Sequence, residues 1–255
     1  MIKSISKVLI LILIISSTSC VSKKEILYFQ NDVAVSKQHK QEFTLVYKQN
    51  DLLTINVSAL DVEAVKPFNL STISYSALSN AVNSAPKQQS YLIDTKGEIN
   101  FPVLGNIKLA GLTREQSIDL ITTKLKPYVK EATVNIHILN FRINVLGDVK
   151  KPGTFLIENE RVTILDALAM SGDLNISGER TIEIKRETAS GIVSGFIDLK
   201  SNNLFSSPFY YLQQNDVVYI SPNKAKSQSA SYNQNTGVII SVASILISLI
   251  AVLTR

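Results

Sequence analysis

The stretch from Tyr91 to Thr113 reads YLIDTKGEINFPVLGNIKLAGLT, and its short apolar runs separated by turn residues predict part of a small α+β domain. Asp94–Gly97 is a polar turn between the apolar segments Tyr91–Ile93 and Ile99–Val103, which predicts a β-hairpin. Gly105–Gly111 predicts a further short strand between two glycines.

A helix and another strand are expected directly after this stretch. Thr113 and Gln116 have the spacing of a capping box, and Pro127 is expected to end the helix. Val134–Ile138 alternates apolar and polar residues, which predicts a half-buried strand. His137 lies on the polar face of that strand, so we interpret it as a solvated or hydrogen-bonded side chain and not a catalytic one.

A second α+β module is predicted further along the chain. Phe141–Val145 alternates as a strand, Gly147–Gly153 is a turn, and Thr154–Ile157 is the returning strand. Thr163 caps a short helix over Ile164–Met170. Two further alternating segments predict a hairpin, and their ranges are Ile182–Lys185 and Gly191–Leu199.

The last strand of this module repeats a pattern from the start of the first one. Gln214–Ile220 reads QNDVVYI and Gln49–Ile55 reads QNDLLTI. Two interpretations are open. The repeat marks two related strand starts in linked domains, or it reflects independent use of Asn-Asp turn chemistry.

The N-terminus has the three-part layout of a secretory signal peptide. Lys3 and Lys7 precede the apolar run Val8–Ile15, which is too short to span a bilayer that needs ~20 residues, and small polar residues follow it. Ser17–Cys20 resembles a bacterial lipobox, and the Cys20 thiol is the nucleophile that could accept a diacylglyceryl group. The alternative is a plain signal peptide followed by an incidental cysteine.

The C-terminus carries a second apolar segment. Val238–Leu253 predicts a transmembrane helix of about 24 Å, a length that suits a thin outer membrane. Small residues recur on one face of this helix and suit helix packing in lipid or the lining of a pore. A simple tail anchor is the alternative. The small-residue stripe consists of Ser241, Ser244, Ser248 and Ala251.

Composition excludes several classes of protein. The chain has 255 residues, 45% hydrophobic and 18% charged, with 1 Cys, 2 His and a formal net charge of +5. These numbers exclude a disulfide scaffold and a metal cluster, and they give little reason to expect nucleic acid as a partner. Removal of residues 1–19 would take away two lysines and lower the net charge to +3.

The sequence does not predict an enzyme, a cofactor or a metal site. No Ser–His–Asp spacing or phosphate-binding loop is found. Glycoside hydrolysis needs two carboxylates facing each other across a cleft. The available carboxylates each lie in a turn or helix cap that explains them structurally, and they are Asp94, Glu98, Asp148 and Asp166.

Three segments together resemble the bacterial outer-membrane polysaccharide export lipoproteins. They are Tyr91–Thr113, Val145–Phe155 (VLGDVKKPGTF) and Thr163–Leu168 (TILDAL). The last two are similar to a soluble-ligand-binding β-grasp (SLBB-like) domain of that family. The resemblance implies a homo-oligomeric ring whose terminal helices line an opening in the outer membrane. It also implies an inner-membrane polysaccharide co-polymerase as partner, often with a tyrosine kinase.

The resulting hypothesis is an outer-membrane lipoprotein, with its bulk in the periplasm, that forms a conduit for capsular or extracellular polysaccharide. The alternative is a non-conducting scaffold lipoprotein that binds a glycan or a partner protein. The expected fold class is α+β, with two small mixed domains followed by a C-terminal transmembrane helix. The expected segments are a signal peptide (1–19), a lipid-anchored linker (20–42), an export domain (43–139), a β-grasp-like domain (140–222), a polar linker (223–237) and the transmembrane helix (238–253).

Overall fold

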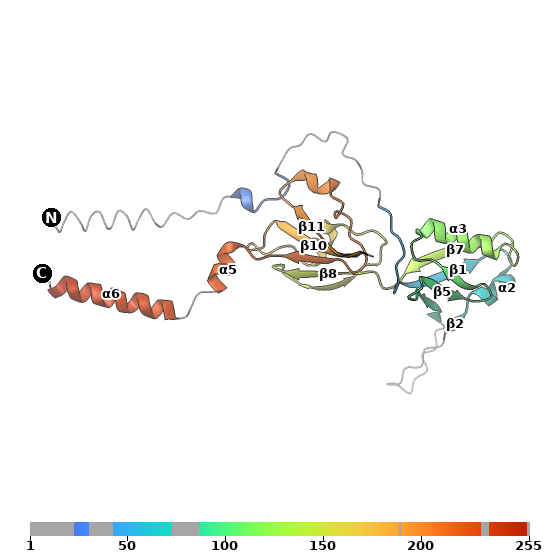
Figure 1. Ribbon diagram of the computed structural model, residues 1–255, viewed down its shortest axis with the longest axis horizontal. Coiled ribbons are helices and arrows are strands. Elements are labelled where there is room, and N and C mark those ends of the chain that lie inside the picture. The colour runs from blue at the N-terminus through green and yellow to red at the C-terminus, as the bar shows by residue number, and fades with distance from the viewer. Residues whose placement is uncertain (1–22, 31–42, 73–86, 189, 231–234, 254–255) are drawn as a thin grey trace, which may run out of the picture.

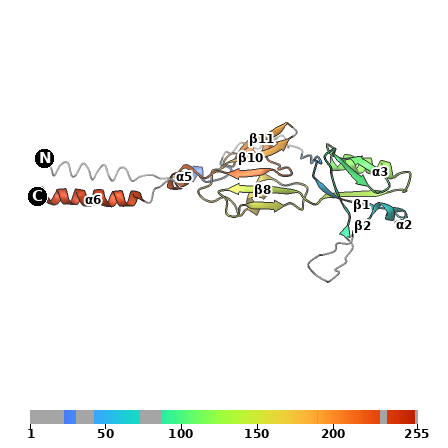
Figure 2. The ribbon, with the colours of Figure 1, turned by 60° about the horizontal axis from the view of Figure 1, so that its bottom comes forward.

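The computed structural model describes residues 23–30, 43–72, 87–188, 190–230 and 235–253. The predicted signal peptide and Cys20 lie outside these residues, so cleavage and acylation stay predictions. The described strands form two bodies that follow one another along the long axis of the molecule (Figures 1 and 2). We call them the first and second modules.

A three-stranded antiparallel sheet in the order β4–β1–β7 forms the centre of the first module. Every second residue of β1 is buried, because successive side chains of a strand point to opposite faces. Helix α3 contributes Ile121 and Leu125 to the core on one face of the sheet. The bounds are β1 Leu52–Ser58, β4 Ser90–Leu92, β7 Thr133–Ile138 and α3 Arg114–Leu125.

The hairpin predicted across Asp94–Gly97 is wrong in its strand pairing. The turn forms, since the amide of Gly97 donates to the carbonyl of Asp94 at 3.0 Å. However, β4 pairs with β1, while β5 (Glu98–Phe101) pairs with β6 (Gly105–Lys108). Gly105 has a φ of 72°, which permits the tight reversal between β5 and β6.

The capping signals are confirmed. Thr113 and Gln116 form a complete capping box at the start of α3, and the helix ends at Leu125, before Pro127. Short elements surround this sheet. They are α2 Val62–Val65, the 3₁₀-helix η2 Lys66–Phe68, β2 Ser71–Thr72 and β3 Lys87–Gln88.

A five-stranded sheet in the order β11–β10–β12–β8–β9 forms the second module. Both predicted hairpins are present, β8 with β9 and β10 with β11, and β12 lies parallel to β8. Helix α4 begins at a capping box of Thr163 and Asp166. The bounds are β8 Arg142–Gly147, β9 Gly153–Leu156, α4 Ile164–Met170, β10 Thr181–Thr188, β11 Gly191–Asp198, η3 Asn202–Ser206 and β12 Val217–Ile220.

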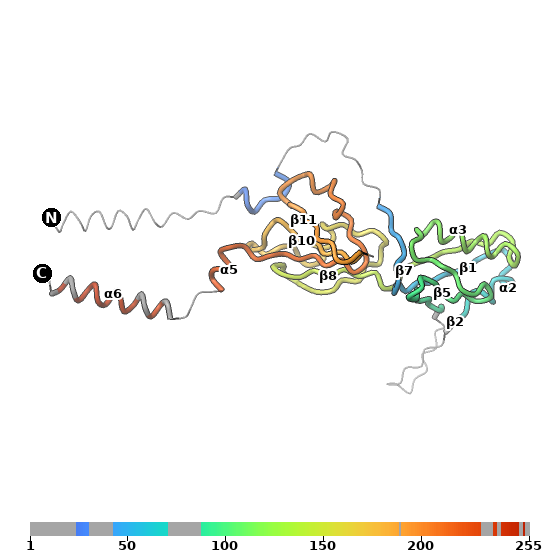
Figure 3. Tube along the Cα trace, viewed as in Figure 1, coloured from blue at the N-terminus to red at the C-terminus, as the bar shows by residue number. Residues whose placement is uncertain are grey.

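Each module has its own cluster of buried apolar side chains. The first cluster includes Ile55 and Ile136 from facing strands, and the second includes Ile184 and Val218. The chain passes from β7 into β8 at the junction between the modules, where Ile138 packs against both clusters (Figure 3). The domain boundaries proposed from the sequence stay a prediction.

The prediction of a C-terminal transmembrane helix is wrong. The polar linker contains a short helix, α5 (Lys224–Ala230), and the apolar segment forms α6 (Asn235–Leu253). Across the described part of the chain, no helix has both the length and the apolar character needed to cross a membrane. The apolar segment Val238–Leu253 is shorter than the ~20 residues that a bilayer requires, and three serines interrupt it.

Candidate functional site

The exposed face of the β4–β1–β7 sheet is a candidate contact surface. It lies opposite the face that buries Ile55 and Ile136. Asn56 of β1 lies directly opposite Asn135 of β7, and Thr54 lies opposite His137. We define the neutral face by its polar residues, all exposed or half-buried, which are Thr54, Asn56, Ser58, Ser90, Thr133, Asn135 and His137. The paired leucines Leu52 and Leu92 lie at one end of the same face.

The chemistry of the neutral face is that of amides, hydroxyls and one imidazole. Asn and Ser or Thr side chains both donate and accept hydrogen bonds, so they match the hydroxyl groups of a sugar polymer. Exposed neutral hydrogen bonds each add only about 1 kcal/mol net, so such a surface binds weakly at each point. His137 is exposed, as the alternation of its strand predicts, and the absence of a catalytic role for it stays a prediction.

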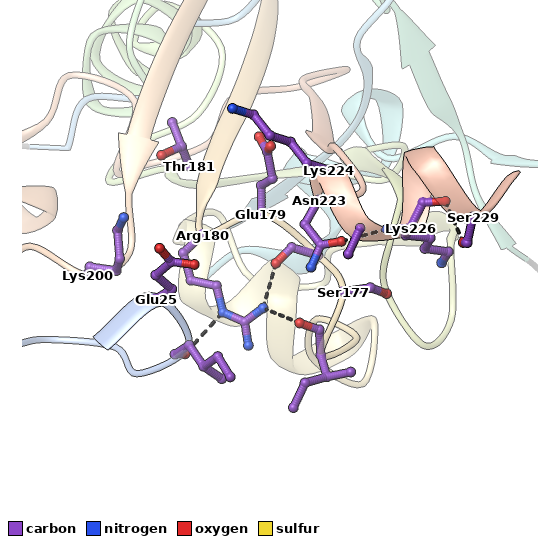
Figure 4. A pocket seen from close by; sticks show the side chains of 14 residues that line it. Glu25, Ser177, Glu179, Arg180, Thr181, Lys200, Asn223, Lys224, Lys226 and Ser229 are labelled. Atoms are coloured by element: carbon purple, nitrogen blue, oxygen red, sulfur yellow. Dashed lines mark hydrogen bonds between the residues drawn. The ribbon is translucent and has the colours of Figure 1, made fainter. Parts of the chain in front are cut away.

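A separate pocket of about 980 Å³ lies in the second module, next to the N-terminal segment and helix α5. Figure 4 shows Arg180, Lys200 and Lys224 around this pocket, together with Glu25 and Glu179. The pocket joins three distant parts of the chain, because its walls come from residues 25–26, from the two ends of the β10–β11 hairpin (residues 176–181 and Lys200) and from residues within 223–229.

The N-terminal segment is bound to the second module by specific contacts. The amide of Phe29 donates to the carbonyl of Leu199 at 3.0 Å, and the Phe29 ring stacks on Phe205. The Tyr28 hydroxyl donates to Asp173 at 2.7 Å, and burial, with this hydrogen bond, raises the pKa of Tyr28. Residues 26–30 are therefore part of the folded second module.

Asp148, in the VLGDVKKPG motif, attaches helix α5 to the second module. The Lys226 ammonium donates to its carboxylate at 2.6 Å, and Ser177 and Asn175 donate as well. Burial acts to raise the pKa of Asp148, but these hydrogen bonds outweigh it and the net shift is downward. The preceding Gly147 has a φ of 95°, and a Cβ there would collide with the carbonyl of Ile220.

Two of the other candidate carboxylates, Asp94 and Asp166, have structural roles. Asp94 accepts the amides of Lys96 and Glu98 in its turn, and Asp166 completes the cap of α4. Within the described ranges, no group of three or more His, Cys, Asp or Glu side chains could hold a metal ion.

The small-residue stripe lies on α6. The Ser241 hydroxyl donates to the carbonyl of Gly237 at 2.8 Å, and the Ser248 hydroxyl donates to that of Ile245 at 2.8 Å. Both hydroxyls therefore bond within their own helix, as serines in apolar helices often do. Ser244 and Ala251 belong to the same helix, and a packing role for the stripe stays a prediction.

Comparison with known proteins finds a family that the first module resembles. Residues 41–139 match the family model described as "Polysaccharide biosynthesis/export protein". The resemblance seen in the motifs is thereby confirmed over this part of the chain.

Two curated relatives resemble the same part of the chain. "EPS I polysaccharide export outer membrane protein EpsA" of Ralstonia solanacearum is 36% identical over 95 residues, which is 36% of this chain and 25% of the relative. The protein of the same name from Ralstonia nicotianae is 35% identical over 94 residues, again 36% of this chain and 25% of the relative. The matched part thus spans about a quarter of the length of each relative.

Proposed function

We propose that this protein takes part in the export of a capsular or extracellular polysaccharide at the outer membrane, as an oligomeric conduit. The observation that carries the proposal is the match of residues 41–139 to the polysaccharide export family. The names of the two relatives, which are outer membrane proteins of polysaccharide export, support the same role and location. An export role requires no chemistry on the glycan, so we do not propose an enzyme.

The neutral face supplies a physical reason why the first module suits a moving polymer. Its side chains can exchange hydrogen bonds with sugar hydroxyls and with water at similar free energy. A positively charged face would retain an acidic polysaccharide, because charge-assisted hydrogen bonds are about twice as strong as neutral ones. A negatively charged face would repel the same polymer. We therefore propose that the neutral face contacts the exported chain.

The proposed location follows from the predicted lipoprotein start. Acylation of Cys20 would hold the protein on the outer membrane, with both modules in the periplasm. The proposed partners are further copies of this chain in a ring and an inner-membrane polysaccharide co-polymerase with its tyrosine kinase. Mass spectrometry of the mature N-terminus tests the acylation of Cys20.

The function is tested by deleting the gene and complementing the deletion with single variants. Deletion should abolish surface polysaccharide and leave glycan in the periplasm. Thr54→Lys places a charge on the neutral face and should reduce surface polysaccharide severalfold at an unchanged protein level. Thr123→Lys is the matched control, because Thr123 is an exposed residue of α3, away from this face. Normal export by Thr54→Lys would refute the role of the neutral face.

The runner-up is a non-conducting scaffold lipoprotein, and the pocket beside Arg180 is the observation that favours it. Crosslinking in membranes separates the two functions. A conduit should give closed oligomers of this chain, whereas a scaffold can act as a monomer.

A further inference from the structure

Arg180 is a buried cation without a carboxylate partner among the described residues. Its side chain is almost entirely buried, with an exposure of 9% for the residue. The guanidinium Nε donates to the carbonyl of Ile26 at 3.0 Å, and Nη1 points at the carbonyls of Gly178, Asn175 and Ile176 at 2.5, 3.2 and 3.3 Å. Burying a charge is costly unless it is paired, and carbonyl dipoles compensate it only in part.

The remaining guanidinium nitrogen of Arg180, Nη2, has no hydrogen-bond partner in the part of the chain that the structure describes. The Tyr28 ring covers the group at 5.7 Å from the guanidinium carbon, which leaves the Nη2 edge for another molecule. A planar guanidinium with a free edge is suited to bind the oxygens of a phosphate.

The surroundings of Arg180 favour an anion that carries apolar groups. Lys200 and Lys224 line the same pocket, and neither forms an ion pair within the described residues. Two carboxylates, Glu25 and Glu179, offset part of this charge. Ile176 also lines the pocket although it is 75% exposed, so an aliphatic surface lies next to the cations.

The pocket also lies close to the predicted point of membrane attachment. Glu25 in its wall follows Cys20 by only five residues. A fully extended chain of that length spans at most about 18 Å. Residues 26–30 are bound to the second module, so an acylated Cys20 would hold the pocket near the lipid headgroups.

We propose that this pocket binds the anionic headgroup of a phospholipid, with the phosphate on Arg180 and the lysines and the glycerol end of the acyl chains on Ile176. The proposal deepens the proposed function, because it rests on membrane attachment through Cys20. Such binding would set the orientation of the second module on the membrane surface, which a single flexible acyl anchor does not do.

Calorimetric titration tests the proposal on the purified full-length protein in a neutral detergent. The titrants are dihexanoyl phosphatidylglycerol, dihexanoyl phosphatidylcholine and inorganic phosphate. Phosphatidylglycerol should bind at least fivefold more tightly than either of the others. Equal affinity for the two lipids would contradict the claim that the pocket selects an anionic headgroup. Equal affinity for phosphatidylglycerol and inorganic phosphate would contradict the claim that the ligand is a lipid.

Matched variants assign the binding to this pocket. The double variant Lys200→Gln/Lys224→Gln should weaken phosphatidylglycerol binding about tenfold, because each lysine near an anionic headgroup contributes a factor of about five or less. The control Lys108→Gln/Lys124→Gln removes the same charge from exposed residues of the first module. An equal loss of phosphatidylglycerol affinity in both double variants would show that the lipid does not bind at this pocket. Arg180→Gln is less suitable, because it would also remove the hydrogen bond to the Ile26 carbonyl that helps to hold residues 26–30.

Failure of this proposal can be distinguished from failure of the proposed function. The titration does not depend on glycan export or on acylation, whereas the gene deletion measures export alone. A second variant, Ile176→Ser, should weaken the lipid severalfold and leave inorganic phosphate unchanged. An unchanged affinity of Ile176→Ser for the lipid would show that Ile176 does not contact it.

Discussion

The two Asn-Asp turns that precede the central strands of the two modules have nearly the same backbone geometry. Asn50 and Asn215 have φ values of 67° and 65°. Asp51 accepts the amide of Lys48 at 2.8 Å, and Asp216 accepts the amide of Gln213 at 2.8 Å. The repeat noticed in the sequence is therefore a repeat of local structure, and its origin by relationship or by shared turn chemistry stays open.

The turns differ in what surrounds the two aspartates. Asp216 is completely buried and forms a bidentate ion pair with Arg186, at 3.0 Å from Nε and 2.7 Å from Nη2. Asp51 is also buried, but among the described residues no cationic side chain forms a salt bridge with it. Burial raises the pKa of Asp51 to about 6, although the hydrogen bond from the Lys48 amide opposes this shift. The same turn thus holds a paired charge in one module and an unpaired acid in the other.

The two turns meet at the junction of the modules. The Lys48 ammonium donates to the Gln213 side chain at 2.9 Å. Asn140 contacts both turns. Its side-chain amide donates to the backbone carbonyl of Asn50, and its backbone carbonyl accepts from the side-chain amide of Gln214. The two turns therefore connect the modules to each other, in addition to stabilising the strand that follows each of them.

The largest expected effect is the loss of the buried ion pair. Asp216→Ala leaves Arg186 buried without a carboxylate, and this should lower the free energy of unfolding of the second module by about 3–5 kcal/mol. At pH 4, where Asp51 is protonated, Asp51→Ala removes only the acceptor for one amide and should cost about 1 kcal/mol. Urea unfolding, followed by hydrogen exchange of peptides from each module, measures both changes.

The exposed pair Lys66 and Glu63 is the control for this first prediction. Its side chains are 65% and 78% exposed, so Lys66→Ala should change the free energy of unfolding by less than about 0.5 kcal/mol. If Asp216→Ala costs no more than Asp51→Ala, the ion pair is not what distinguishes the two turns.

The second prediction concerns pH. The pKa of Asp51 is raised from its ordinary value of 3.8 to about 6 in the folded protein, so the folded state holds this proton more tightly. The stability that protonated Asp51 contributes is present below pH 4 and is lost as the pH rises through 6, a total loss of about 3 kcal/mol.

Asp51→Asn should remove this loss, because an amide does not ionise. The test compares urea midpoints of the native protein and the variant at several values between pH 4 and pH 7. The difference between the two curves isolates Asp51 from other groups, such as Asp148, whose pKa is lowered. Parallel curves would show that Asp51 has an ordinary pKa.

The third prediction tests the shared backbone geometry. A positive φ disfavours residues with a Cβ other than Asn and Asp by about 1–2 kcal/mol. Asn50→Ala and Asn215→Ala should therefore each cost about 1 kcal/mol in free energy of unfolding, and Asn→Gly at either position should cost much less. Unequal costs of the two glycine variants would indicate a role of the side chain, as for Asn215, which accepts a hydrogen bond from Arg142 at 3.2 Å.

The sequence predicted the turns, the two helix caps and the second-module hairpins because each depends on residues close together in the chain. It did not predict the Arg186–Asp216 pair, whose members are 30 residues apart. The prediction of a hairpin across Asp94–Gly97 is wrong because β4 pairs with β1, which is distant in the sequence. Alternation alone cannot tell which neighbour a strand will choose.

The same limit applies to the candidate sites. The alternation of Val134–Ile138 predicts that Asn135 and His137 lie on a polar face. The residues that β1 and β4 add to the neutral face were not predicted, because no such alternation was assigned to those strands. The pocket was missed because its walls come from three separate segments, and no local motif marks Arg180. The C-terminal segment was predicted as a membrane span from its apolar composition, although its length was already marginal.

The smallest expected effect concerns the hydrogen bond that joins the two turns. Lys48→Met should cost less than about 1 kcal/mol, because the Lys48 side chain is only partly buried and water can replace the bond. A double-mutant cycle with Gln213→Ala isolates the interaction, and a coupling of about 0.5 kcal/mol is expected between groups in direct contact. A coupling of zero would mean that Asn140 alone joins the turns. In that case Asn140→Ala should increase hydrogen exchange at the junction, while Lys48→Met should leave it unchanged.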